Sequence, residues 1–146
     1  MKTPLRRIVL IGENIELRIV SLVVRCREVA EDVVVFDTGS TDETVQLAGE
    51  VQSRVVEYNG DLTPQHLAKA AVSASLDDGL TLFLPISPMW KMAELPLSVN
   101  RAREGWDIHY LYREQPGTNA LEPMMLANAS MGHLIASAAG LQHLAQ

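Results

Sequence analysis

The stretch that decides the fold is Val33–Thr44, which reads VVVFDTGSTDET. It begins with a continuous apolar run rich in β-branched residues, as is typical of a central strand in a parallel sheet. The run ends at Asp37, and a glycine-containing turn follows. Ser40 and Glu43 then have the spacing of a capping box, in which Ser40 caps a helix and Glu43 reaches back to it. The stretch therefore predicts a strand, a tight turn and a helix that runs to about Glu50.

The remainder of the chain repeats this alternation of strands and helices. Short apolar runs predict strands at Arg7–Ile11, Val33–Asp37, Arg54–Tyr58, Leu80–Leu84 and Asp107–Tyr112. Helical spacing of apolar residues predicts helices at Ile15–Ala30, from Thr63-Pro64 to about Leu76, near Trp90–Arg103, and at Met124–Leu144. A loop is expected at Gln115–Asn119. Alternating strands and helices predict an α/β domain with a mostly parallel sheet.

Composition narrows the class of protein. The chain has 146 residues, enough for one domain, and a net charge of −6 from 12 basic and 18 acidic residues. Because nucleic-acid binding usually requires a basic surface, this balance argues against a nucleic-acid partner. Cys26 is the single cysteine, so no intrachain disulfide can form. No apolar stretch resembles a signal peptide or is long enough to span a membrane, so a cytoplasmic protein is expected.

The Asp-Thr-Gly-Ser run at Asp37–Ser40 admits two interpretations. An aspartic protease carries such a run, but it needs two facing aspartates on an all-β fold, whereas here a helix follows directly. In a doubly wound α/β domain, ligands bind beyond the carboxyl ends of the strands, where Asp37 is expected. Its carboxylate could accept hydrogen bonds from a base N–H or a ribose hydroxyl. The alternative is that Asp37 and Ser40 only organise the turn.

The sequence around this run resembles a known family. Glu31–Ala48, EDVVVFDTGSTDETVQLA, is similar to the nucleotide-binding core of inverting family 2 glycosyltransferases, which have the GT-A fold. Tyr58–Ala71 and Leu80–Pro88 are similar to later segments of that family, so the resemblance covers about the first 90 residues. It implies a three-layer, Rossmann-like GT-A domain with a C-terminal helix rich in small residues. Residues 1–146 would form one shortened domain, with 1–90 as its nucleotide-binding half and 91–146 as the remainder.

The resemblance also implies a site for a nucleotide-diphosphate sugar. Its nucleotide-binding residues would be Ile11, Glu13, Asp37, Gly39 and Ser40, and Glu13-Asn14 loosely matches the family's first-strand motif. Family members usually use Mg²⁺ or Mn²⁺ held by an Asp-x-Asp motif. In this sequence that motif falls on Pro85-Ile86-Ser87, so both carboxylates are replaced, and no metal ligand is assigned. The family's Arg-Asn pair falls on His66-Leu67.

Two functions follow from this pattern. The first is a hexosyltransferase-type glycosyltransferase or a nucleotide-sugar-binding protein that uses the Asp37 loop. The second is a catalytically inactive domain of the same fold that serves as a structural or protein-interaction module. Small residues at Gly132, Ala136 and Gly140 recur every four positions in the expected last helix. That helix would pack on its own sheet or form a docking face for a second copy or another protein.

Overall fold

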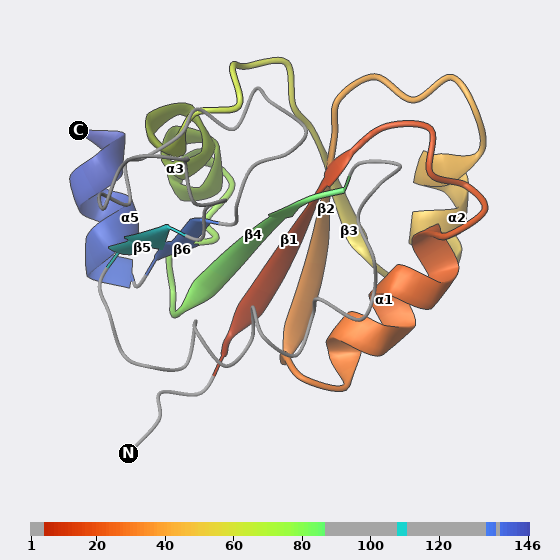
Figure 1. Ribbon diagram of the computed structural model, residues 1–146, viewed down its shortest axis with the longest axis horizontal. Coiled ribbons are helices and arrows are strands. Elements are labelled where there is room, and N and C mark those ends of the chain that lie inside the picture. The colour runs from red at the N-terminus through yellow and green to blue at the C-terminus, as the bar shows by residue number, and fades with distance from the viewer. Residues whose placement is uncertain (1–4, 87–107, 111–133, 137) are drawn as a thin grey trace, which may run out of the picture.

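The computed structural model describes residues 5–86, 108–110, 134–136 and 138–146, and these residues form a three-layer α/β fold (Figure 1). The strands are β1 (Arg7–Gly12), β2 (Asp32–Asp37), β3 (Arg54–Glu57), β4 (Thr81–Pro85), β5 (Ile108–Tyr110) and β6 (Leu134–Ala136). The helices are α1 (Ile19–Arg27), α2 (Thr44–Glu50), α3 (Pro64–Ser73) and α5 (Ala138–Ala145). The prediction of an α/β domain with a mostly parallel sheet is confirmed.

The described strands form one sheet in the order β3-β2-β1-β4-β6-β5. β3, β2, β1 and β4 are parallel, whereas β6 runs antiparallel to both β4 and β5. The chain moves outward from β1 through β2 to β3 and then crosses back to place β4 on the other side of β1. The order of the strands therefore reverses between β1 and β4, and ligands of doubly wound sheets bind at the carboxyl ends beside such a point.

The sheet is buried on both faces, because the strands alternate their side chains between two cores. One face packs Ile8, Leu10, Val33, Val35, Leu82 and Leu84 against the buried sides of α1 and α2. The other packs Val9, Ile11, Val34, Phe36 and Phe83 against α3 and α5. Figure 1 shows α1 and α2 on one side of the sheet and α3 and α5 on the other. Burial of both faces explains why the strands read as continuous apolar runs rather than alternating ones.

The first four strands lie where their apolar runs predict them, with ends that differ by one residue at most. α3 also begins as its sequence predicts. Thr63 is the N-cap, its hydroxyl oxygen accepts a hydrogen bond from the backbone N–H of His66 at 3.3 Å, and Pro64 is the first helical residue. Proline suits this position because its missing N–H would have no partner in the helix. α1 is shorter than the predicted helix Ile15–Ala30 at both ends. Residues before Ile19 form the loop that follows β1, and the helix ends at Arg27.

The long helix expected over Met124–Leu144 is wrong in its middle part. Leu134–Ala136 forms β6, and the helix α5 covers only Ala138–Ala145. Pairing with β4 provides hydrogen-bond partners for the free edge of that strand, so tertiary pairing overrides the local helical pattern. Ala136 therefore lies in a strand and Gly140 in a helix, so the small residues do not share one helix face.

Several predicted segments lie outside the described residues. They are the helix near Trp90–Arg103, the loop Gln115–Asn119, the first part of the Met124–Leu144 helix, and Gly132. Of the predicted strand Asp107–Tyr112, Ile108–Tyr110 is described and forms β5.

The amino ends of the central strands are joined by a buried arginine. Arg7, in β1, is only 3% exposed, and its Nε donates to Asp32 at 2.7 Å while Nη1 donates to Asp78 at 2.7 Å. Nη1 also donates to the backbone carbonyl oxygen of Leu76 at 2.9 Å. Burial by itself would lower the pKa of the Arg7 guanidinium, but the hydrogen bonds to the two carboxylates outweigh it and raise that pKa. This cluster stabilises the end of the sheet opposite the candidate site.

Candidate functional site

The carboxyl ends of the four parallel strands meet at one edge of the sheet. Asp37 at the end of β2 pairs in register with Gly12 of β1 on one side and with Glu57 of β3 on the other. On β4, Pro85 pairs with Ile11. These ends and the loops that follow them lie beside the reversal of strand order, which is where an α/β sheet offers a ligand site.

Asp37 is buried and holds the turn that follows it. Asp37 is only 5% exposed, and both of its carboxylate oxygens accept hydrogen bonds from Ser40. The Ser40 backbone N–H donates to Oδ2 at 3.1 Å, and the Ser40 hydroxyl donates to Oδ1 at 2.5 Å. Gly39 lies between them with φ +129°, a conformation that glycine adopts without a steric cost. Asp37 and Ser40 therefore form a closed turn at the end of β2.

The capping box predicted at Ser40 and Glu43 is wrong. α2 begins at Thr44, and its N-cap residue is Glu43, which makes no side-chain capping bond. The Ser40 hydroxyl is already used by Asp37, and Asp42 takes the capping role instead, with Oδ1 accepting from the Thr44 N–H at 3.0 Å. Although burial raises the pKa of Asp42, the hydrogen bonds from Thr44 outweigh it and lower that pKa.

Asn14, in the loop after β1, connects this loop to the one after β2. Its side-chain Oδ1 accepts hydrogen bonds from the backbone N–H groups of Thr41 at 2.8 Å and Asp42 at 3.3 Å. In the other direction, the N–H of Asn14 donates to the Ser40 hydroxyl at 3.0 Å. We call this set of contacts between the two loops the loop clasp. Sequence reasoning treated Asn14 only as part of a loose motif match and missed this role.

Further hydrogen bonds extend the loop clasp toward α2. The N–H of Ile15 donates to the Thr44 hydroxyl at 2.9 Å, and the N–H of Glu16 donates to Asp42 Oδ2 at 3.3 Å. The Glu16 carboxylate in turn accepts from the N–H of Glu43 at 3.1 Å. Two carboxylates of the chain itself thus occupy the amino end of α2, which would otherwise favour an anion from outside.

The structure brings four of the five predicted nucleotide-binding residues to this edge. Asp37, Gly39 and Ser40 form the turn, and Glu13 is exposed on the neighbouring loop. A Cβ placed on Gly39 would lie 3.8 Å from Glu13 Oε2, so the Glu13 carboxylate lies over the turn. Ile11 is different, because its side chain is buried in the core and its carbonyl accepts a hydrogen bond from the N–H of Ile86 at 2.8 Å.

The position of the expected metal motif offers no carboxylate. Pro85 is half-buried at the end of β4, the Ile86 side chain is buried, and Ser87 lies outside the described residues. Within the described part of the chain, no group of three or more His, Cys, Asp or Glu side chains is placed to hold a metal ion. Mg²⁺ requires oxygen ligands, usually carboxylates, so the described residues at this position do not fit the metal that the family resemblance implies.

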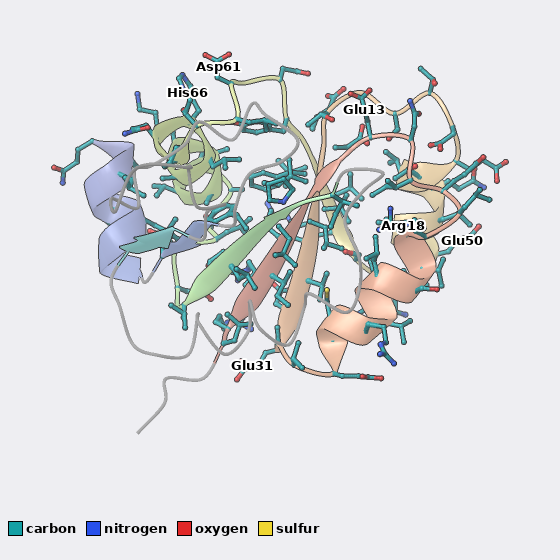
Figure 2. All side chains as sticks on the ribbon, viewed as in Figure 1. Glu13, Arg18, Glu31, Glu50, Asp61 and His66 are labelled. Atoms are coloured by element: carbon teal, nitrogen blue, oxygen red, sulfur yellow. The ribbon has the colours of Figure 1, made fainter. Side chains whose placement is uncertain are left out.

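The described loops at this edge are acidic. The acidic residues of these loops are Glu13, Glu16, Asp42, Glu43 and Asp61, and their basic residue is Arg18. The strand ends add Asp37 and Glu57. Figure 2 shows Glu13, Asp61 and His66 along this edge, with Glu31 at the opposite end of the sheet. His66 is exposed in the first turn of α3, and its Nδ1 lies 2.6 Å from the Thr63 hydroxyl oxygen. Carboxylates accept hydrogen bonds from hydroxyl and N–H groups, but they repel phosphate.

Tyr58, the residue directly after β3, fixes the loop that follows this strand. Its ring stacks on Phe36 with 5.5 Å between the centroids, and its hydroxyl donates to the backbone carbonyl of Asp61. Burial raises the pKa of Tyr58 to about 12, and the nearby Asp61 carboxylate adds to this effect. The Tyr58 hydroxyl therefore stays protonated at neutral pH and acts as a hydrogen-bond donor that fixes the loop after β3.

No protein-family model matches the chain, and no curated protein shows significant similarity to it. In the described ranges, no helix combines the length and the apolar character needed to cross a bilayer.

Proposed function

We propose that this chain is a glycosyltransferase-like domain of the GT-A type that binds the nucleoside part of a nucleotide-diphosphate sugar at its carboxyl edge. The observation that carries the proposal is the placement of Asp37. It lies at the end of β2, in register with Gly12 and beside the reversal of strand order. The resemblance of the Glu31–Ala48 sequence to family 2 glycosyltransferases supports the same assignment.

The chemistry of the edge favours the nucleoside over the diphosphate. The exposed Glu13 carboxylate lies over the Gly39 turn and can accept hydrogen bonds from ribose hydroxyls or from a base N–H. Each Asp37 carboxylate oxygen accepts one hydrogen bond from Ser40 and retains a further lone pair. Because the surrounding loops are acidic, the described residues supply little positive charge for a diphosphate. No step of sugar transfer is therefore assigned to them.

Calorimetric titration of the protein with UDP-, GDP- and dTDP-sugars, with and without Mn²⁺, tests the proposal. We expect binding by one nucleotide class at about micromolar Kd, and a Kd raised about tenfold in Glu13→Gln. Glu50→Gln is the matched control, since Glu50 is an exposed glutamate at the far end of α2 and should bind as the native chain does. Absence of heat with every nucleotide would overturn the proposal.

One observation favours the second candidate, an inactive domain that acts as an interaction module. Leu17, Val20 and Val24 are exposed at the start of α1 and along its outer side, and Leu17 is 94% exposed. Their spacing of three and four residues is that of one helix face, and a contiguous exposed apolar patch is a mark of protein contact sites. A solution mass larger than the 16.0 kDa of one chain, reduced to that value by Leu17→Ser with Val24→Ser, would support this candidate. A monomeric native mass would count against self-association.

A further inference from the structure

The contacts of Asn14 go beyond those of an ordinary loop residue. Asn14 has φ +54°, in the left-handed region that asparagine enters more readily than most residues. This conformation turns its side chain toward the loop after β2. There, Oδ1 accepts from two successive backbone N–H groups, those of Thr41 and Asp42. The Thr41 hydroxyl also lies within 3.3 Å of the same oxygen.

A continuous hydrogen-bonded chain leads from Asn14 to Asp37. The N–H of Asn14 donates to the Ser40 hydroxyl oxygen at 3.0 Å, and that hydroxyl donates its own proton to Asp37 Oδ1 at 2.5 Å. The Ser40 N–H holds the other carboxylate oxygen. Because Ser40 lies directly before Thr41, the side-chain bonds of Asn14 also fix the backbone that carries Ser40. The orientation of the Asp37 carboxylate thus depends on a residue of a different loop.

Glu13 is joined to the same network through its peptide bond to Asn14. The N–H of that peptide donates to the Ser40 hydroxyl, and the Glu13 carboxylate lies over the Gly39 turn. Asn14 therefore contacts the turn that carries Asp37 and is bonded directly to Glu13.

We infer that Asn14 is a positioning residue of this edge. It holds the loop after β2, and with it the Asp37 carboxylate, beside Glu13 in the arrangement that accepts a nucleoside. The inference rests on the proposed function for the identity of the ligand. The positioning itself is a property of the free protein and can be measured without a ligand. Loss of the Asn14 side chain should loosen the loop after β2 while leaving the fold intact, since Asn14 is exposed and belongs to neither hydrophobic core.

Two substitutions separate the side chain of Asn14 from its backbone. Asn14→Gly keeps the left-handed conformation and removes the Oδ1 acceptor. Asn14→Asp keeps an oxygen acceptor at the same place and tolerates the same backbone. Gln52→Gly is the matched control, because Gln52 is an exposed residue with φ +59° just after α2, away from the loop clasp.

Amide hydrogen exchange, followed by NMR in the full chain, measures the positioning. In Asn14→Gly we expect the Thr41 and Asp42 amides to exchange about tenfold faster than in the native chain, because they lose their Oδ1 acceptor. We expect the Ser40 amide, which donates to Asp37, to exchange faster as well, because the loosened loop no longer holds that bond closed. Asn14→Asp should stay within about threefold of native, and Gln52→Gly should leave these amides unchanged. If only the Thr41 and Asp42 amides respond, Asn14 does not position Asp37. If none responds, the loop clasp itself is refuted.

Titration of the same variants with UDP, GDP and dTDP measures the effect on the ligand. We expect Asn14→Gly to raise the Kd about tenfold and Asn14→Asp to restore most of the affinity. If the native chain binds no nucleotide, the proposed function fails, while the exchange rates still decide whether Asn14 positions Asp37. Unchanged affinity in Asn14→Gly with a native chain that does bind would overturn the role of Asn14 in the site.

Discussion

At the scale of the residue, Arg7 is buried whereas the two aspartates that it pairs with are partly exposed. The arginine is 3% exposed, whereas Asp32 and Asp78 are 36% and 52% exposed in their side chains. A carboxylate that loses its partner here can turn to water, but the guanidinium cannot. The cost of breaking these pairs therefore depends on which partner is removed.

We predict that Asp32→Asn combined with Asp78→Asn destabilises the protein more than Arg7→Met does. The double substitution leaves a buried cation without a counter-charge and should cost about 3–5 kcal/mol of the free energy of unfolding. Arg7→Met places an apolar chain of similar length in the buried position and should cost about 1–3 kcal/mol, mainly through lost hydrogen bonds. Urea unfolding of both variants measures the difference. A larger loss of stability in Arg7→Met would contradict the argument that the buried guanidinium depends on its partners more than the exposed carboxylates do.

At the scale of the element, two glycines outside the candidate site differ in the space around them. Gly49 lies in α2, and a Cβ placed there would meet no atom within 4 Å. Gly79 lies in the turn before β4, where a Cβ would come within 2.6 Å of the Cβ of Arg6. Gly49 lowers the stability of its helix, although the space around it would accept a side chain. Gly79 has no such space, because its backbone lies against the Cβ of Arg6.

We expect Gly49→Ala to stabilise the protein by about 0.5–1 kcal/mol, since alanine loses less conformational freedom than glycine when a helix forms. Gly79→Ala should destabilise it, since the Arg6 Cβ is fixed to the backbone and cannot move aside as a flexible side-chain end could. Thermal unfolding of the two variants measures both effects. If the midpoint temperature shifts in the same direction in both variants, the prediction that the surroundings of the two glycines decide the effect is wrong.

Elements defined by local patterns could be predicted from the sequence. Continuous apolar runs located the first four strands, and Thr63-Pro64 located the start of α3, because these signals depend on neighbouring residues only. The role of Ser40 could not be predicted, because its hydroxyl bonds Asp37 instead of capping α2, and it also accepts a hydrogen bond from Asn14, which lies in another loop. β6 was missed for a similar reason, because Leu134–Ala136 is a strand only once β4 offers its free edge.

At the scale of the whole molecule, acid should unfold the chain partly through residues at both ends of the sheet. The hydrogen bond from Arg7 lowers the pKa of Asp78 at the amino ends of the strands. Asp42 at the carboxyl edge also has a lowered pKa, because hydrogen bonds from Thr44 outweigh the effect of burial. A carboxyl whose pKa is lower in the folded state stabilises the fold above its unfolded pKa, and that stability is lost as pH falls through the folded value.

We therefore predict that Asp78→Asn is less stable than the native chain at about pH 6 and that the difference shrinks as the pH falls below about 4, near the ordinary pKa of aspartate. As the pH falls through the lowered pKa of folded Asp78, the native carboxylate becomes protonated and loses its ion pair, as the asparagine already has. Urea midpoints measured across this pH range test the prediction. A difference in stability that stays constant with pH would refute the contribution of Asp78.

The loop clasp also has a consequence for how this sequence can diverge. Each of its two loops uses side chains of the other to satisfy its backbone N–H groups, so neither loop can change length by itself without leaving donors unpaired. In sequences that descend from a common ancestor with this chain, we expect insertions after β1 to accompany insertions after β2. Asn14 and Ser40 should likewise be replaced together.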